Sequence, residues 1–188
     1  MLKYIKLLFV SFVLLQLFGC PAAIIGGGAL GIDTMADRRS PGIIAEDSNI
    51  EFKAFAAIQH FKEQVNSSVI SYNGNVLIVG QVQNQEVKSK IESQIKEMAN
   101  VKLVINELTV GSASSISSRA EDALITSNVK ARFFKENKVS PFYVKVVTEN
   151  KVVYLMGILT EKEAKEAEEI TKNTSKVTKV VKLFEYLK

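Results

Sequence analysis

The chain has 188 residues, of which 47% are apolar and 23% charged, a balance typical of a globular protein rather than a disordered or fibrous one. Its formal net charge is +4, and without Lys3 and Lys6 of the N-terminal segment it is +2, from 22 basic and 20 acidic residues. So weak a charge argues against nucleic-acid binding, and the single Cys excludes a disulfide within the chain.

The first 19 residues have the organisation of a bacterial secretory signal. A short basic start precedes a nearly unbroken apolar run over residues 7–18. A membrane-spanning helix needs about 20 apolar residues, so a run of about a dozen fits the core of a signal peptide better. The run ends in Leu17-Phe18-Gly19-Cys20, which resembles the lipobox of bacterial lipoproteins, where the Cys is acylated. We therefore predict a signal peptide over 1–19 and lipidation of Cys20, against the alternative of a buried thiol in a signal anchor.

The residue after the Cys sorts bacterial lipoproteins between the two membranes of the envelope. Asp is the usual signal for retention in the inner membrane, and this chain has Pro21 instead. We therefore expect a lipid anchor in the outer membrane with the protein on its periplasmic face, and the inner membrane stays as the alternative. Each buried methylene of an acyl chain contributes roughly 0.8 kcal/mol, so several chains would make the attachment practically permanent.

Residues 20–42 are expected to form a flexible tether. Within them, Gly26–Gly31 satisfies the pattern G-x-G-x-x-G that binds dinucleotides in some proteins. No strand is predicted before it and no βαβ unit surrounds it, so the pattern indicates a small-residue linker rather than a nucleotide site.

The rest of the chain contains two copies of one unit. Residues 73–80 (NGNVLIVG) align with residues 150–157 (NKVVYLMG) at a constant shift of 77. Upstream, apolar residues at i, i+4 and i+8 predict a first helix in each copy, with the same buried face. These residues are Ile50, Ala54 and Ile58 in copy one and Ile125, Val129 and Phe133 in copy two.

The remaining elements follow in the same order in both copies. Apolar and β-branched runs predict a hairpin, with Asn73-Gly74 as the turn of the first copy and Glu149-Asn150 as that of the second. A second helix and a last strand close each copy, and Thr160 with Glu163 forms a capping box that predicts the start of the second helix in copy two. The predicted fold class is α+β, two tandem α-β-β-α-β domains, each a three-stranded sheet packed on two helices.

These predictions give domain boundaries at 43–111 and 119–188. The Ser-rich segment 112–118 between them is predicted to be a flexible linker.

The order of elements, the hairpin that ends in Gly and the tandem arrangement resemble the BON domain family. The lipobox and the segment Asp37–Gly42 (DRRSPG) extend this resemblance to the dual-BON lipoproteins of the outer membrane. It implies a non-enzymatic protein that binds anionic phospholipid and supports envelope integrity. It also implies that the first helix of the second domain contacts lipid, although close family members have Trp where this chain has Leu124.

The predicted helix 119–135 can also be examined without the resemblance. The face opposite its buried residues lacks charge and contains a Leu and a Phe, whereas the exposed side of a helix is usually polar. Arg119, Lys130, Arg132 and Lys135 flank this face. An apolar ridge between basic flanks is typical of a helix that lies in a membrane surface. We expect lipid contact from Leu124, Ser127, Asn128, Ala131 and Phe134, and headgroup contact from Lys130, Arg132 and Lys135.

A second interpretation of this face is that it packs against the other domain. The first helix of copy one also has an apolar back, formed by Phe52, Phe55 and Ala56. Contact between the domains would hide either face from water.

No group of residues predicts catalysis. His60 is the only His, which excludes His-dependent catalytic triads and multi-His metal sites, and it is expected to be solvated. The acidic run Glu161–Glu169, interleaved with Lys162 and Lys165, is typical of a solvated face with ion pairs. We therefore expect no enzyme, no cofactor, no metal and no small-molecule substrate. The two functions left open are a phospholipid-binding lipoprotein and an adaptor that binds other envelope proteins.

Overall fold

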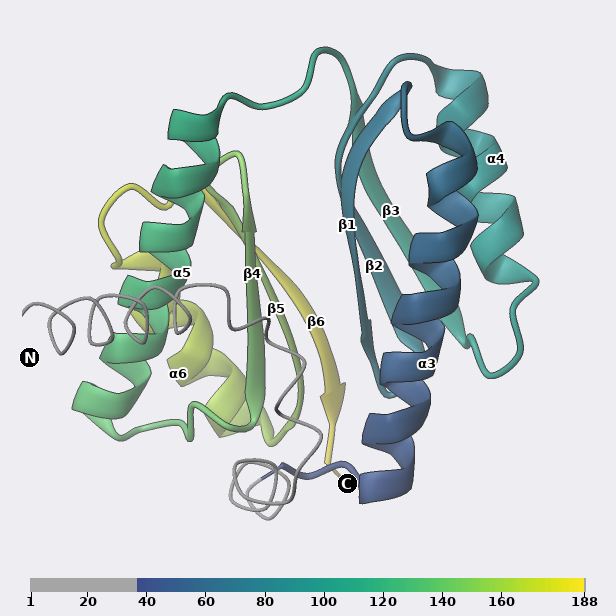
Figure 1. Ribbon diagram of the computed structural model, residues 1–188. Coiled ribbons are helices and arrows are strands. Elements are labelled where there is room, and N and C mark those ends of the chain that lie inside the picture. The colour runs from purple at the N-terminus through teal and green to yellow at the C-terminus, as the bar shows by residue number, and fades with distance from the viewer. Residues whose placement is uncertain (1–36, 188) are drawn as a thin grey trace, which may run out of the picture. The chain divides into compact units, whose positions relative to one another are not determined.

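The computed structural model describes residues 37–187 (Figure 1). The predicted signal peptide, Cys20, the glycine-rich pattern and the predicted tether as far as residue 36 lie outside this range. The elements in chain order are α3 (Pro41–Ile58), η2 (Gln59–Phe61), β1 (Val65–Tyr72), β2 (Asn75–Val82), α4 (Gln85–Lys96), β3 (Leu103–Val110), α5 (Ile116–Glu136), β4 (Val144–Glu149), β5 (Val152–Leu159), α6 (Glu161–Lys172) and β6 (Lys179–Tyr186).

Each half of the chain forms a three-stranded sheet with two helices on one face (Figure 1). β2 is the central strand of the first sheet and pairs antiparallel with β1 and parallel with β3. β5 pairs in the same way with β4 and β6 in the second sheet. The α+β class and the tandem α-β-β-α-β order predicted from the sequence are confirmed.

The predicted helix faces form the two domain cores. Ile50, Ala54 and Ile58 of α3 are buried against β2 and α4, and Ile125, Val129 and Phe133 of α5 are buried against β5 and α6. Apolar residues that the repeat aligns, at a shift of about 76, are thus buried at the same positions of the two domains.

Two helices begin earlier than the sequence analysis placed them. α3 begins at Pro41, whose fixed φ suits the first helical position, and the Ser40 side chain accepts a hydrogen bond from the Ile43 N–H at 3.3 Å. α5 begins at Ile116, because Ser115 caps it by accepting from the Ser118 N–H at 3.1 Å. The end of the expected tether and the end of the expected linker therefore belong to helices.

The hairpin turn of the second domain is shifted by one residue from its predicted position. Asn73 and Gly74 have φ of 53° and 78°, as a two-residue type I′ turn requires. The equivalent residues are Asn150 and Lys151, with φ of 49° and 63°. Glu149 is instead the last residue of β4, paired with Val152. The prediction of Glu149-Asn150 as the turn was wrong, because the repeat alignment places Lys151 opposite Gly74.

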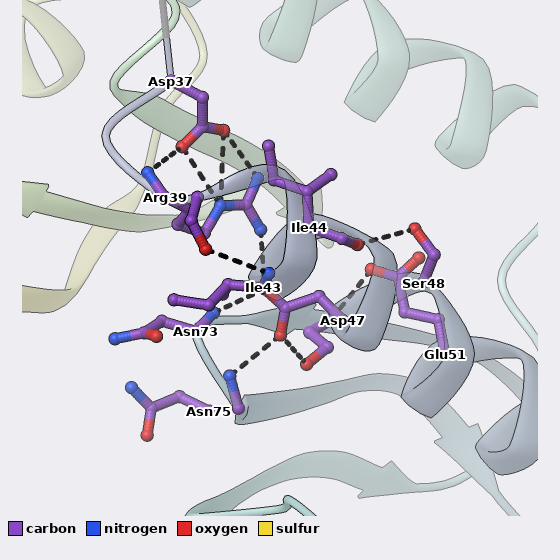
Figure 2. Close-up of polar contacts among 12 residues, drawn as sticks. Asp37, Arg39, Ile43, Ile44, Asp47, Ser48, Glu51, Asn73 and Asn75 are labelled. Carbon is purple, nitrogen blue, oxygen red and sulfur yellow. Dashed lines mark hydrogen bonds and ion pairs between the residues drawn. The ribbon is translucent and has the colours of Figure 1, made fainter. Parts of the chain in front are cut away.

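A buried Asp braces each hairpin against the first helix of its domain, as Figure 2 shows for Asp47. The Asp47 carboxylate accepts hydrogen bonds from the Asn73 and Gly74 N–H groups at 2.7 and 2.8 Å and from the Ser71 hydroxyl at 2.6 Å. Asp122 accepts from the N–H groups of Asn150 and Lys151 at 2.9 and 2.8 Å. Neither Asp was predicted from the sequence to brace a hairpin.

The two domains contact each other through the sheet faces that their helices leave uncovered. Ile70, Tyr72, Leu77 and Val79 of the first sheet form one apolar cluster with Tyr154 and Met156 of the second. Polar contacts border the cluster: the side-chain amides of Asn73 and Asn75 donate to Glu185, and that of Gln81 donates to Glu149. The domains are thus joined by their sheets and not by their helices.

Residues Asp37–Arg39, which we call the clasp, contact both domains. Arg39 donates to Asp37 and, at 2.8 Å, to Asp47 (Figure 2). Its guanidinium lies 3.9 Å from the Tyr72 ring centroid in the first domain. Arg38 reaches the second domain, where it donates to Glu163 at 2.7 and 2.8 Å and to the Ile158 carbonyl at 2.8 Å. Glu163 is therefore in an ion pair, as expected for the acidic run, but its partner Arg38 lies in the clasp, 125 residues earlier in the chain.

Candidate membrane-binding surface

The outer face of α5 is exposed, as a membrane-binding surface requires. Leu124 and Phe134 are 63% and 60% exposed, whereas the apolar residues on the opposite face of α5 are buried in the core. The domains meet through their sheets, so the contact between them does not cover these two side chains. The interpretation that this face packs against the other domain is not supported.

The smaller residues of the predicted site share this face. Ser127, Asn128 and Ala131 are exposed. The Ser127 hydroxyl donates to the Ala123 carbonyl at 2.9 Å, so it brings no unpaired donor to an apolar environment. With Leu124 and Phe134 these residues form what we call the α5 ridge.

The basic residues predicted beside the ridge have different roles. Lys130 and Lys135 are exposed on α5, where they can meet anions. Arg132 is half-buried and points to α6: it donates to Glu136 at 2.7 Å, to the Ile170 carbonyl at 2.8 Å and to the Thr174 hydroxyl at 3.2 Å. Spacing along one helix could not reveal this, because the partners on α6 and beyond lie about 40 residues further along the chain.

Two apolar residues extend the ridge beyond the predicted set. Phe142 lies just before β4, and its ring meets that of Phe134 edge-on with centroids 5.8 Å apart. Ile116, the first residue of α5, is 80% exposed. It precedes Phe134 by 18 residues, which is five helical turns of 3.6 residues, and so lies on the same face. The same periodicity could have identified Ile116 from the sequence, had Ser115 been recognised as the cap.

Charged residues at the first turns of α5 also differ in their pairing. Lys176 and Lys151 both contact Glu121, at 2.8 and 3.0 Å, and their hydrogen bonds lower the pKa of Glu121 below its usual value. Arg119 is exposed and makes no ion pair with any residue in the range 37–187. It is therefore a cation beside the ridge that is free to bind an anion.

The second apolar helix back predicted from the sequence is exposed as well. Phe52 and Phe55 of α3 are 72% and 59% exposed, and Ala56 lies beside them at the surface. We call these three residues the α3 patch. It stands on the first domain and makes no part of the contact between the sheets.

No catalytic arrangement is seen among the described residues. His60 is exposed in η2, as expected, and no group of three potential metal ligands occurs within residues 37–187. Other members of the acidic run are held in ion pairs, Glu166 with Lys138 and Glu168 with Lys172 and Lys182. Within the same range, no helix is both long enough and apolar enough to span a membrane.

The domain family follows from comparison with known proteins. The family model of the BON domain matches residues 46–112 and 121–188, one match for each half of the fold. The chain belongs to the BON domain family. We call its two halves BON1 and BON2 from here on.

Two relatives are similar to this chain over most of its length. The chain is 37% identical over 189 aligned residues to the outer membrane lipoprotein DolP of Haemophilus influenzae, an alignment that covers 99% of this chain and 97% of that protein. It is 28% identical to a 21 kDa hemolysin of Actinobacillus pleuropneumoniae, over 68% of each chain. The protein is thus a dual-BON lipoprotein of the outer membrane, and these family and relative names describe no enzyme.

Among solved structures, the chain is similar to the C-terminal domain of CdsD, the structural protein of the type III secretion system of Chlamydia trachomatis. The two share 13% sequence identity with a TM-score of 0.31, over 72% of this chain and 96% of that domain.

Proposed function

We propose that this lipoprotein binds anionic phospholipid through α5 of BON2 and by this contact supports the integrity of the envelope, without catalysing a reaction. The observation that carries the proposal is the exposure of Leu124 and Phe134 on a helix whose other face is fully buried. Exposing an aligned Ile, Leu and Phe to water along one helix is unfavourable. Exposed apolar patches of this kind mark binding surfaces.

The energies suit a protein that is already held at a membrane. Burying a whole Leu or Phe side chain contributes roughly 1.5–3 kcal/mol, so the exposed parts of Leu124 and Phe134 would contribute about 1–2 kcal/mol each. Each cation near an anionic surface adds about 1 kcal/mol, and Lys130, Lys135 and Arg119 are available for this. The sum corresponds to weak binding for a free domain. It becomes effective when an acyl anchor at Cys20 raises the local concentration of lipid.

The test is sedimentation of the chain from Ala36, which keeps all the described residues, including both cores and the clasp. Vesicles containing phosphatidylglycerol would be compared with vesicles of phosphatidylcholine. We expect selective binding to the anionic vesicles and at least tenfold weaker binding for Leu124→Glu and for Phe134→Glu. Leu103→Glu is the matched control, because Leu103 is 56% exposed on β3 of BON1 and its substitution introduces the same charge. Equal loss in all three variants, or none, would refute the assignment to α5.

The link to envelope integrity needs cells. A strain without its own copy would be complemented with the lipidated wild type or with Leu124→Glu, and its sensitivity to detergent compared. We expect the variant to fail in complementation while its abundance is unchanged. Full complementation by Leu124→Glu would separate lipid binding from the cellular role.

A second candidate function is an adaptor for other envelope proteins, which the α3 patch favours. Phe52 and Phe55 form an aromatic surface, and aromatic side chains are enriched where proteins bind each other. If the wild-type chain binds neither kind of vesicle, and a photo-crosslinker at residue 55 but not at residue 103 captures a defined protein in cells, the adaptor becomes the leading function.

A further inference from the structure

A polar pocket among the described residues lies at the end of the contact between the two domains, next to the start of α5. Its volume is about 670 Å³. BON1 contributes the segment Lys62–Asn66 and residues Gln81 and Gln83, the segment Gly111–Ala113 forms another wall, and BON2 contributes Arg119. The pocket therefore requires both domains.

The polar character of the pocket follows from the sheet that leads into it. Asn66 and Gln81 are partners in the β1–β2 ladder and lie on the same face as the apolar contact between the domains. The Asn66 amide donates to the Gln81 side-chain oxygen at 3.2 Å, and the Ser114 N–H donates to the same oxygen at 2.8 Å. At the pocket, the apolar contact between the two sheets is thus replaced by amide side chains held in place by hydrogen bonds.

Two cations line this pocket without an acidic partner. Neither Lys62 nor Arg119 makes an ion pair with any of residues 37–187, whereas the three other Arg side chains in that range are all paired. Glu63 is the one acidic residue that lines the pocket, so its lining has a net charge of +1 from two cations and one carboxylate. Such a lining complements an anion of charge −1, and its amides complement hydroxyl groups.

We infer that this pocket holds the headgroup of an anionic phospholipid, a singly charged phosphodiester that carries hydroxyl groups, while the α5 ridge holds the adjoining acyl region. The inference rests on the proposed function, since it assigns the headgroup part of the same lipid contact. The two parts are neighbours: Arg119 belongs to the first turns of α5, and Ile116, at the beginning of the ridge, follows the pocket wall Gly111–Ala113 by three residues. Among anions, the phosphodiesters of the membrane surface are the ones that an anchored protein meets at the highest local concentration.

The pocket is tested with the free headgroup and with vesicles, again on the chain from Ala36. Glycerophosphoglycerol is the probe and glycerophosphocholine the control, observed through backbone amide resonances in NMR spectra. We expect shifts at Gly111, Asn66 and Arg119 that saturate with the first compound only. They should be lost in Lys62→Gln and in Arg119→Gln.

With anionic vesicles, we expect each of these two substitutions to weaken binding about fivefold, the equivalent of about 1 kcal/mol for one near-surface cation. Lys96→Gln, which removes an exposed charge from α4 of BON1, should change binding less than twofold. All three positions are on the surface, so folding can be checked by an unchanged amide spectrum elsewhere in the chain.

The outcomes separate the pocket from the ridge. If Leu124→Glu abolishes vesicle binding while Lys62→Gln and Arg119→Gln behave like Lys96→Gln and no amide shifts, the pocket assignment is wrong and the proposed function stands. If the headgroup shifts the pocket amides but Leu124→Glu binds vesicles as the wild type does, the proposed function fails. The pocket would then bind a soluble phosphodiester, which overturns its assignment to a membrane lipid.

Discussion

Replacing Asp47 with Ala should be among the most destabilising substitutions of a polar residue in BON1. The Asp47 carboxylate is nearly inaccessible and accepts hydrogen bonds from the N–H groups of Asn73 and Gly74, from the Ser71 hydroxyl and from Arg39. The substitution leaves the Gly74 N–H and the Ser71 hydroxyl buried without a partner, at a cost of about 1–3 kcal/mol each. It also releases Arg39, and hence the clasp, from α3.

The expected loss in the free energy of unfolding is about 3–5 kcal/mol, the range found when one partner of a buried ion pair is removed. Asp122→Ala is the internal comparison, because Asp122 accepts only two backbone hydrogen bonds at the equivalent hairpin and should cost about 2 kcal/mol. Urea unfolding at pH 7 gives both values, and hydrogen exchange at the Asn73 and Gly74 amides reports the local loss. A cost below about 1 kcal/mol for Asp47→Ala, with protected amides, would refute the role of the hairpin brace.

Asp47→Asn adds a test by pH. Burial alone would raise the pKa of Asp47, but the hydrogen bonds from Ser71, Gly74, Asn73 and Arg39 outweigh it and hold the pKa below the ordinary 3.8. A carboxyl group whose pKa is lowered by folding stabilises the fold above its unfolded pKa, and this contribution disappears as the pH falls through the folded pKa. The stability difference between wild type and Asp47→Asn should therefore be full at pH 7 and shrink below about pH 4. A difference that is unchanged down to pH 2 would contradict the pKa argument.

Two further predictions concern BON2. Lys151→Gly should stabilise the chain by about 0.5–1 kcal/mol in urea unfolding, because Lys151 has a φ of 63° that Gly adopts without strain. A loss of stability would show that the exposed ion pair between Lys151 and Glu121 contributes more than the backbone strain costs. The hydrogen bond from Arg38 lowers the pKa of Glu163 to about 2. The wild type should therefore lose stability relative to Glu163→Gln as the pH falls from about 4.5 to 2. Melting temperatures of the two proteins that stay parallel across this interval would contradict the prediction.

The cores and the order of elements could be predicted from the sequence because they depend on local periodicity. Ile125, Val129 and Phe133 recur at helical spacing, and the apolar runs that became β2 and β5 are buried on both faces, so each signal lies within a dozen residues. The exposed face of α5 could be inferred from the buried one, since residues on the side of a helix opposite its buried residues must face outward. Leu124 and Phe134 were placed correctly for this reason.

What the sequence did not indicate depends on contacts between distant segments. Arg132 has helical spacing suited to the membrane flank, yet its partners Ile170 and Thr174 are 38 and 42 residues away. Arg38 and Glu163 are 125 residues apart, and nothing local to either predicts the ion pair. The two hairpin braces were accessible in principle, since Asp47 and Asp122 occupy equivalent places in the repeat at a shift of 75.

Under the proposed function, an acyl anchor combined with a helix that binds lipid weakly would explain why the α5 ridge is modest. From Cys20 to Asp37 the chain spans 17 residues, at most about 60 Å when extended, so an anchor at Cys20, as we propose, would keep BON2 within reach of the membrane. Short tethers give effective concentrations in the millimolar range, and a dissociation constant of 1 mM corresponds to about 4 kcal/mol, which the ridge and two or three cations supply. Near this balance the occupancy changes most with each added or lost charge. Under this proposal, a permanent anchor with a weak ridge would make the position of α5 sensitive to the local content of anionic lipid, whereas a strong ridge would be bound to the membrane regardless of its composition.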